Sequence, residues 1–136
     1  MLPERYLALK VVMMPRDTNP YGTVFGGVVL SYIDQAGAVG TRHEIAKQGF
    51  PEQPIVTVAM NRVEFHEPLF VGDTVSFWTQ LRHLGNTSIT MHVVVETERA
   101  SRLIMLTEAD VTYVAVRLDG QRRKPVPIRG PRTGIE

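Results

Sequence analysis

One helix-like segment dominates this chain, running from residue 26 to about residue 48. Between Val28 and Val39 nearly every side chain is apolar or small, so the segment is apolar on most sides. A helix of this kind is normally buried, and at about 1.5 Å per residue it is roughly 33 Å long. Gly37 and Gly40 leave room for another backbone to approach closely. The rest of the chain must therefore supply a large apolar surface that covers this helix.

The segments around the helix are rich in Val and Thr or alternate between apolar and polar residues, which is typical of β-strands. One precedes the helix and four follow it, and the Gly85-Asn86 pair joins two of them as a hairpin-type turn. Successive strands with short connections pair in the antiparallel sense. The sequence therefore predicts an α+β fold in which a five-stranded antiparallel sheet wraps the long central helix. The expected strands cover residues 6–14, 55–65, 73–84, 87–98 and 103–118.

An open sheet of this kind has two edges, and unpaired strand edges tend to pair with another chain. The strand expected at residues 55–65, with its Val-Thr-Val run, is the candidate edge. We therefore expect homodimerisation through a long edge strand.

Length and composition restrict the class of protein. The 136 residues fit a single domain, which we place at residues 1–120, followed by a basic C-terminal tail at residues 121–136. No cysteine is present, which excludes disulfides, thiolate zinc sites and a cysteine nucleophile. The four histidines show no metal-ligand spacing and no carboxylate cluster nearby, so no metal is expected. Neither a membrane-spanning run nor the layout of a signal peptide is found, so we expect a cytoplasmic protein without a membrane partner.

Charge is unevenly distributed along the chain. From Arg117 to the C-terminus, six basic and two acidic residues give a net charge of +4, whereas the first 116 residues carry −3. A basic end on a mildly acidic body attracts phosphates, but a solvated, partly disordered terminus has the same composition. The segment has no interleaved aromatic residues, so nucleic-acid binding is not expected.

The start of the helix is the candidate site. A turn-rich loop ends there in Gly26 and Gly27, whose amides either polarise a carbonyl oxygen or simply form a flexible joint. Asp34 follows about two turns later, either on a solvent-facing stripe or in a cleft as general base or nucleophile. In the loop, Asn19 is either a turn residue or a neutral donor to water or an oxyanion.

Four segments, in this order, carry a resemblance to a known family: DTNPYGTVFGG (residues 17–27), LSYIDQAG (30–37), FHEPLFVGDTV (65–75) and GNTS (85–88). Together they resemble the hotdog-fold acyl-CoA thioesterases, and within them the YciA-type and cytosolic acyl-CoA hydrolase group, over residues 10–118. The resemblance implies a long central helix wrapped by an antiparallel sheet, in agreement with the element order. It also implies hydrolysis of an acyl-CoA substrate to a free carboxylic acid and coenzyme A.

The same resemblance assigns roles to individual residues. The family's catalytic helix carboxylate corresponds to Asp34, and its partner asparagine, contributed by the facing subunit of a dimer, corresponds to Asn19. The family's glycines that open the helix toward the thioester carbonyl correspond to Gly26 and Gly27. No metal or other cofactor is implied. Contacts with coenzyme A are implied for Gly85, Asn86, Thr87 and Ser88, and for Arg122, Arg123 and Lys124.

Some alternatives stay open. The resemblance implies at least a homodimer, and a hexamer built as a trimer of dimers is not distinguished from it. A non-catalytic acyl-CoA sensor on the same fold is the alternative function, although a sensor does not need the acid at Asp34. The chain departs from related groups at Phe25, where a wider group has histidine, and at Asn61, where many relatives have an acid.

Overall fold

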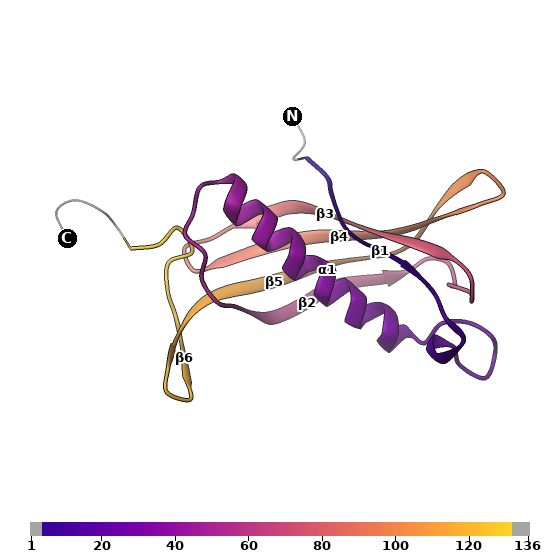
Figure 1. Cartoon of the computed structure of the whole chain (residues 1–136), viewed down its shortest axis with the longest axis horizontal. Coiled ribbons are helices and arrows are strands. Elements are labelled where there is room, and N and C mark those ends of the chain that lie inside the picture. Colours follow the sequence, from indigo (N-terminus) through magenta and orange to yellow (C-terminus); the bar gives the residue numbers. More distant parts are fainter. Residues whose placement is uncertain (1–3, 132–136) are drawn as a thin grey trace.

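The structure, a computed structural model, describes residues 4–131 and consists of one long helix and one sheet (Figure 1). The helix α1 (Gly26–Lys47) begins directly after the glycine-ended loop, as predicted. It ends before Gly49, whose φ of +77° is a left-handed conformation that glycine adopts without strain. The other elements are β1 (Tyr6–Val12), the 3-10 helix η1 (Pro15–Asp17), β2 (Ile55–Phe65), β3 (Thr74–Leu84), β4 (Ser88–Arg99), β5 (Arg102–Asp119) and β6 (Arg122–Pro125).

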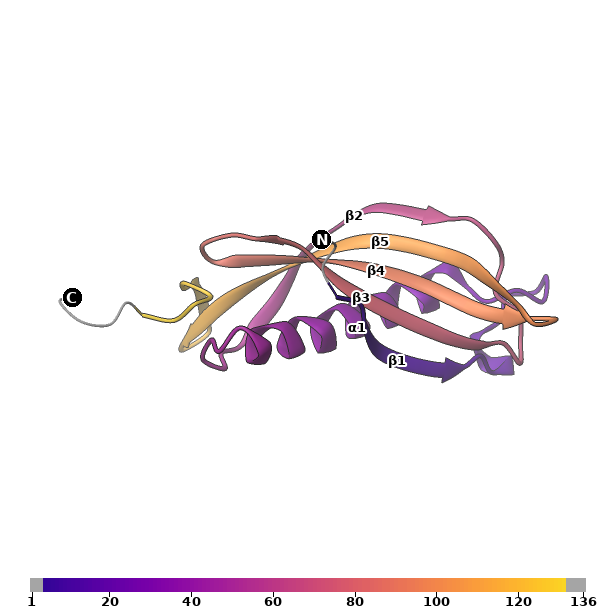
Figure 2. The ribbon, with the colours of Figure 1, turned by 90° about the horizontal axis from the view of Figure 1, so that it is seen from above.

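The sheet is antiparallel throughout, with the order β1-β3-β4-β5-β2. Figure 2 shows α1 lying along one face of this curved sheet. The predicted fold class is therefore confirmed. The predicted edge is confirmed as well, because β2 pairs with β5 alone among the strands of residues 4–131.

The core lies between α1 and the sheet. Alternate residues of β3 and β4 are buried against the helix, as their period of two predicts. The opposite face of these strands carries mostly polar side chains. The fully buried side chains of the core include Ile33, Val75, Phe77, Ile89, Met91, Val93, Val95, Leu106, Val111 and Tyr113.

The helix contacts the sheet closely at two glycines. A Cβ atom on Gly37 would overlap the hydroxyl of Tyr113, and one on Gly40 would overlap the side chain of Thr79. Both glycines are buried, which confirms the close approach expected from the sequence.

The prediction of a helix buried on nearly all sides is only partly correct. Within the described chain the sheet covers one side of α1, and the other side stays open. Val39 remains 37% exposed, and Phe25 just before the helix is 49% exposed. None of the helices in residues 4–131 is long and apolar enough to span a membrane. The apolar open side of α1 is consistent with a further contact surface.

The basic C-terminal segment is folded as far as the structure describes it. Residues 122–125 form the short strand β6, which pairs with the end of β5 and adds a sixth strand to the five expected. Beyond it, the amide of Val126 donates to the carbonyl of Ala115, and the amide of Ile128 donates to that of Asn86. Ile128 is fully buried. Residues 121–131 are therefore not a free tail, and Arg132 lies outside the described residues.

Candidate functional site

The loop before α1 is organised by the side chain of Asn19. Its Oδ1 accepts hydrogen bonds from the amides of Tyr21 (2.9 Å) and Thr23 (3.1 Å), and its Nδ2 donates to Thr23 Oγ1 (2.7 Å). Asn19 is thus a turn-forming residue, which was one of the two interpretations of the sequence. An amide nitrogen carries two hydrogens, so one donor of Asn19 is left for a further partner. The two interpretations are therefore compatible.

The helix start presents exposed backbone amides. Its N-cap residue is Phe25, and no side chain among residues 4–131 caps it by a hydrogen bond. Gly26 and Gly27 are both exposed, and the first turn contains no acidic residue. Amides in this position have no partner inside the helix and lie at the positive end of its dipole. We call Asn19, Gly26 and Gly27 the loop half-site.

Asp34 lies on the side of α1 that faces the edge strand β2. Thr57 of β2 donates a hydrogen bond from Oγ1 to Asp34 Oδ1 (2.7 Å). Tyr113 of β5 donates from its hydroxyl to the Asp34 main-chain carbonyl (2.7 Å), and the same hydroxyl lies 3.4 Å from Oδ1. Asp34 Oδ2 has no protein partner among the hydrogen bonds recorded for residues 4–131. We call Asp34, Thr57 and Tyr113 the carboxylate half-site.

The environment of Tyr113 keeps its hydroxyl protonated. Burial raises its pKa well above the usual value, and the negative charge and hydrogen bond of Asp34 raise it further. A protonated phenol donates a hydrogen bond, so Tyr113 fixes the helix backbone at Asp34. The solvent-stripe interpretation of Asp34 is therefore incomplete, because two side chains from the sheet hold this residue.

Sequence reasoning missed Thr57 and Tyr113. The only signal for Thr57 was a hydroxyl inside the Val-Thr-Val run of the expected edge strand, and Tyr113 was one of several large residues in a buried strand. Neither position is near Asp34 along the chain. Only the pairing of β2 with β5 and the packing of α1 on the sheet bring them together.

The bond from Thr57 leads to a first prediction. We expect Thr57→Val to lower kcat about tenfold, the lower end of what a hydrogen bond to a charged group contributes. Steady-state kinetics on an acyl-CoA substrate measures this change. Thr90→Val is a matched control, because Thr90 contacts Thr112 (2.8 Å) on the face of the sheet away from the helix. An unchanged kcat for Thr57→Val would mean that Asp34 works without this bond.

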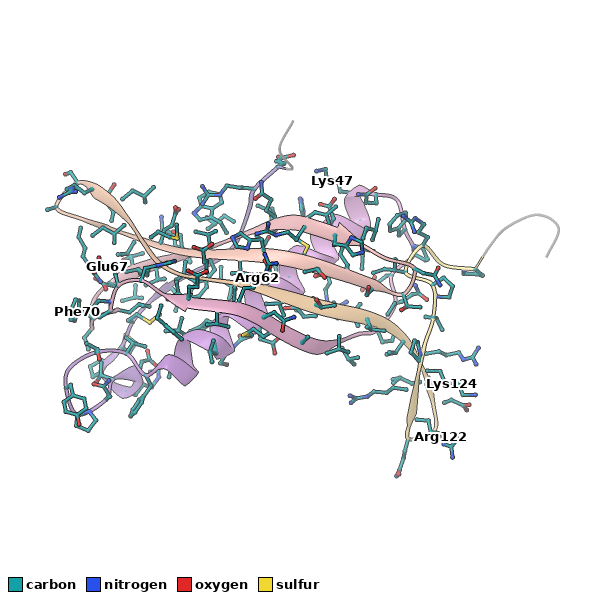
Figure 3. All side chains as sticks on the ribbon, turned by 180° about the vertical axis from the view of Figure 1, so that it is seen from behind. Lys47, Arg62, Glu67, Phe70, Arg122 and Lys124 are labelled. Carbon is teal, nitrogen blue, oxygen red and sulfur yellow. The ribbon has the colours of Figure 1, made fainter. Side chains whose placement is uncertain are left out.

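The residues expected to contact coenzyme A lie at the other end of α1 from the loop half-site. The turn of Gly85, Asn86, Thr87 and Ser88 contacts both β5 and the C-terminal segment. The carbonyl of Thr87 accepts from the amide of Ala115 in β5, and the carbonyl of Asn86 accepts from the amide of Ile128. Figure 3 shows Arg122 and Lys124 at the end of the molecule opposite to Glu67 and Phe70. The structure thus brings the turn and the basic segment to one end of the molecule. Their contact with coenzyme A stays a prediction.

The three basic residues of β6 do not share one face. Arg122 pairs with Asp119 and Lys124 with Arg117, which places these four side chains on the same side of the hairpin. Arg123 pairs with Leu118 and points to the opposite side. Lys124 is also 3.4 Å from the carboxylate of Asp119. A phosphate group on one face would therefore meet Arg122 and Lys124 without Arg123.

Two of the histidines, which have no metal-ligand spacing in the sequence, lie beside carboxylates that the fold brings to them. On the outer face of the sheet, His66 Nε2 lies 2.8 Å from Glu108, and the two nitrogens of His92 lie 3.2 Å from Glu108 and 2.7 Å from Asp110. Ligand atoms of Glu64, His66 and Glu108 fall within 4.8 Å of one another. These side chains form a network of close histidine–carboxylate contacts that links β2, β5 and β4. The absence of a metal from the reaction stays a prediction.

Asp73, in the VGD part of the FHEPLFVGDTV segment, has a structural role. Although burial alone would raise its pKa, hydrogen bonds and the charge of Arg99 lower the pKa below the usual value. Asp73 Oδ2 also accepts from the amide of Phe70 (2.8 Å). This carboxylate therefore fixes the turn between β2 and β3 and takes no part in either half-site.

Comparison with known proteins finds the same family by sequence and by structure. The profile of the Thioesterase superfamily matches residues 21–103, more than half of the chain. The acyl-CoA thioester hydrolase YciA of Salmonella typhimurium is 35% identical over 133 residues, which cover 94% of this chain and 95% of that protein. The hexameric hotdog-fold thioesterase of Campylobacter jejuni is 40% identical with a TM-score of 0.75, over 90% of this chain and 89% of that one. The hexameric thioesterase of Yersinia pestis is 34% identical with a TM-score of 0.75, over 93% and 99%.

Proposed function

Since this chain belongs to the thioesterase superfamily, we propose that it uses Asp34 to hydrolyse acyl-CoA thioesters at a site shared by two subunits. The protein is an acyl-CoA thioester hydrolase that releases a free carboxylic acid and coenzyme A. The observation that carries the assignment of Asp34 is its geometry. One carboxylate oxygen is held by Thr57, and the other has no recorded protein partner within residues 4–131.

In one route, Asp34 takes a proton from water through its free oxygen, the water oxygen adds to the thioester carbonyl carbon, and the C–S bond breaks as the sulfur leaves and takes up the proton to give coenzyme A. In the other route, the free oxygen of Asp34 attacks the carbonyl carbon, the C–S bond breaks to release coenzyme A and leave an acyl anhydride on Asp34, and water then hydrolyses this anhydride to the free acid and the Asp34 carboxylate. The amides of Gly26 and Gly27 stabilise the negative charge on the carbonyl oxygen. The remaining donor of Asn19 orients the water or the carbonyl.

The spacing along α1 supports a site made from two chains. Gly27 and Asp34 are seven residues apart, about 10 Å along the helix axis. Amides at a helix start point away from the rest of the helix, which adds to this distance. A carbonyl oxygen about 3 Å beyond Gly27 is therefore too far from Asp34 of the same chain. In our proposal the loop half-site of one subunit meets the carboxylate half-site of another.

Self-association is consistent with the surfaces left open in one chain. The edge strand β2 has no buried residue, and Val58 is 56% exposed on it. The Campylobacter jejuni and Yersinia pestis thioesterases are hexamers. We propose that this chain forms at least a homodimer and that three dimers form a hexamer. Light scattering after size exclusion measures the assembly. A cytoplasmic location and a reaction without a metal or other cofactor stay predictions.

Subunit mixing tests the shared site. Asn19→Ala and Asp34→Ala homodimers should each be nearly inactive, whereas a mixture allowed to exchange subunits should regain activity. Half of the dimers would then be heterodimers with one intact site out of two, so we expect about a quarter of the wild-type rate. Release of coenzyme A, detected with a thiol reagent, measures this rate.

Subunit exchange must be shown independently, for example with two differently labelled variants. If exchange occurs and no activity returns, Asn19 and Asp34 do not complement each other across subunits. The same thiol assay on the wild type separates a hydrolase from a sensor. A protein that binds acyl-CoA without releasing coenzyme A would contradict the enzymatic function.

A further inference from the structure

A hollow of about 330 Å³ opens beside the start of α1. It lies between the helix and the segment that follows β2, and Val24, Val29, Phe65 and Leu69 provide much of its apolar lining. Gly26 lies in its wall, so the loop half-site borders this space.

The ring of Phe65 stands at the boundary between the hollow and the helix start. A Cβ atom built on Gly26 would lie 3.5 Å from Phe65 Cζ, so the ring packs against the backbone of the loop half-site. Phe65 is the last residue of β2, and it is 53% exposed although it is aromatic. No other side chain lies within 4 Å of that Gly26 position among the described residues.

A thioester has two arms that leave the reacting carbonyl in different directions. The coenzyme A arm carries phosphates, which bind where basic side chains gather. The described residues that line the hollow include Glu67 and no Lys or Arg, so its charge is the opposite of what phosphates require. The acyl arm is apolar and gains free energy when an apolar wall covers it.

Resting on the proposed function, we propose that this hollow receives the acyl chain of the substrate and that Phe65 limits the chain length it accepts. With the carbonyl oxygen at the Gly26 and Gly27 amides, the acyl carbons begin beside Gly26. They then extend between the helix and residues 65–69. The Phe65 ring lines the hollow next to this entrance and fills part of the space, so the size of this side chain sets how much volume is left for the acyl carbons. Phe65 is a specificity-determining residue and takes no part in the chemical step.

Chain-length profiles of Phe65 variants test this proposal. We expect Phe65→Ala to raise the ratio of kcat/KM for octanoyl-CoA to that for butyryl-CoA about tenfold, the lower end of what methylene groups contribute in an apolar pocket. Phe65→Trp should lower the same ratio. The matched control is Phe70→Ala, because Phe70 is also an exposed aromatic residue near this end but packs beside Arg99 and does not line the hollow. Its ratio should equal that of the wild type.

Each outcome bears on the proposal. Unchanged ratios in both Phe65 variants, with normal folding by thermal melting, would overturn it. If kcat/KM changes by the same factor for acyl chains of every length, and free coenzyme A inhibits the variants more weakly, the hollow holds the coenzyme A arm instead. If Phe65→Ala fails to fold, Phe65→Leu takes its place, with the same expected direction. A wild-type protein that hydrolyses no acyl-CoA would contradict the proposed function, whereas active enzymes with identical profiles would contradict only the acyl-pocket assignment.

Discussion

Replacing Asp34 with alanine should lower kcat by about 10²–10⁴, the contribution that a positioned general base makes to many enzymes. The reason is that only one oxygen of this carboxylate is bonded: Thr57 donates to Oδ1, and no hydrogen bond from the described part of the chain reaches Oδ2. The fold should survive, because the main bond of Tyr113 goes to the backbone carbonyl of residue 34, which alanine retains. Steady-state release of coenzyme A, combined with size exclusion, measures both quantities.

The neighbouring helix residue provides the control for this experiment. Gln35 is exposed and its side chain contacts only Ser31 (3.3 Å) in the recorded bonds of residues 4–131, so Gln35→Ala should leave kcat near the wild-type value. Asp34→Asn keeps the shape of the side chain and removes the base, and it should be impaired as strongly as Asp34→Ala. An Asp34→Ala oligomer with wild-type turnover would remove Asp34 from the mechanism and leave the carboxylate half-site without a catalytic role.

Replacing Gly27 with proline should lower kcat about 10²–10³-fold, as expected for the loss of one oxyanion donor. Proline removes the backbone N–H but is tolerated in the first turn of a helix, where that N–H has no partner inside the helix. Gly27 is the second residue of α1, and a Cβ atom there would meet none of the described residues within 4 Å. The substitution therefore removes a donor with little change in packing.

The Gly27→Ala variant distinguishes the effect of losing the backbone N–H from the effect of adding side-chain atoms at this position. Alanine fills the same open space and keeps the N–H, so its kcat should stay close to that of the wild type. Circular dichroism and melting temperature compare the folding of the two variants. Equal kcat values for Gly27→Ala and Gly27→Pro would show that this amide does not stabilise the carbonyl oxygen. The Gly26 amide would then be the only oxyanion donor of the pair.

Much of the fold could be predicted because its determinants are local. The turn at Gly85-Asn86, the period of two in β3 and β4, and the glycine after α1 each act within a few residues. β6 was not predicted, since three basic residues followed by a proline carry no strand pattern of their own. They form a strand only because the end of β5 offers an unpaired edge and Ile128 is anchored in the core.

The candidate site also has one part that the sequence predicts and one part that depends on tertiary contacts. Asn19, Gly26, Gly27 and Asp34 lie within 16 residues of one another, so the loop, the helix start and the acid could be recognised from chemistry and spacing. The proposed pairing across two subunits rested on the resemblance, and the helix spacing now supports it. The hollow beside Phe65 could not be foreseen, because its walls come from the loop, the helix and the end of β2.

By itself, the sequence determined one long helix, its antiparallel sheet, the edge position of β2 and a carboxylate two turns into the helix, since periodicity and turn chemistry act over short distances. Only the tertiary structure decided how that carboxylate is held. Thr57 lies 23 residues from Asp34 and Tyr113 lies 79 residues away, and the contacts depend on the register between β2 and β5 and on how closely Gly37 lets α1 approach the sheet. Contacts of this kind are set by the packing of whole elements, which no local pattern in the chain specifies.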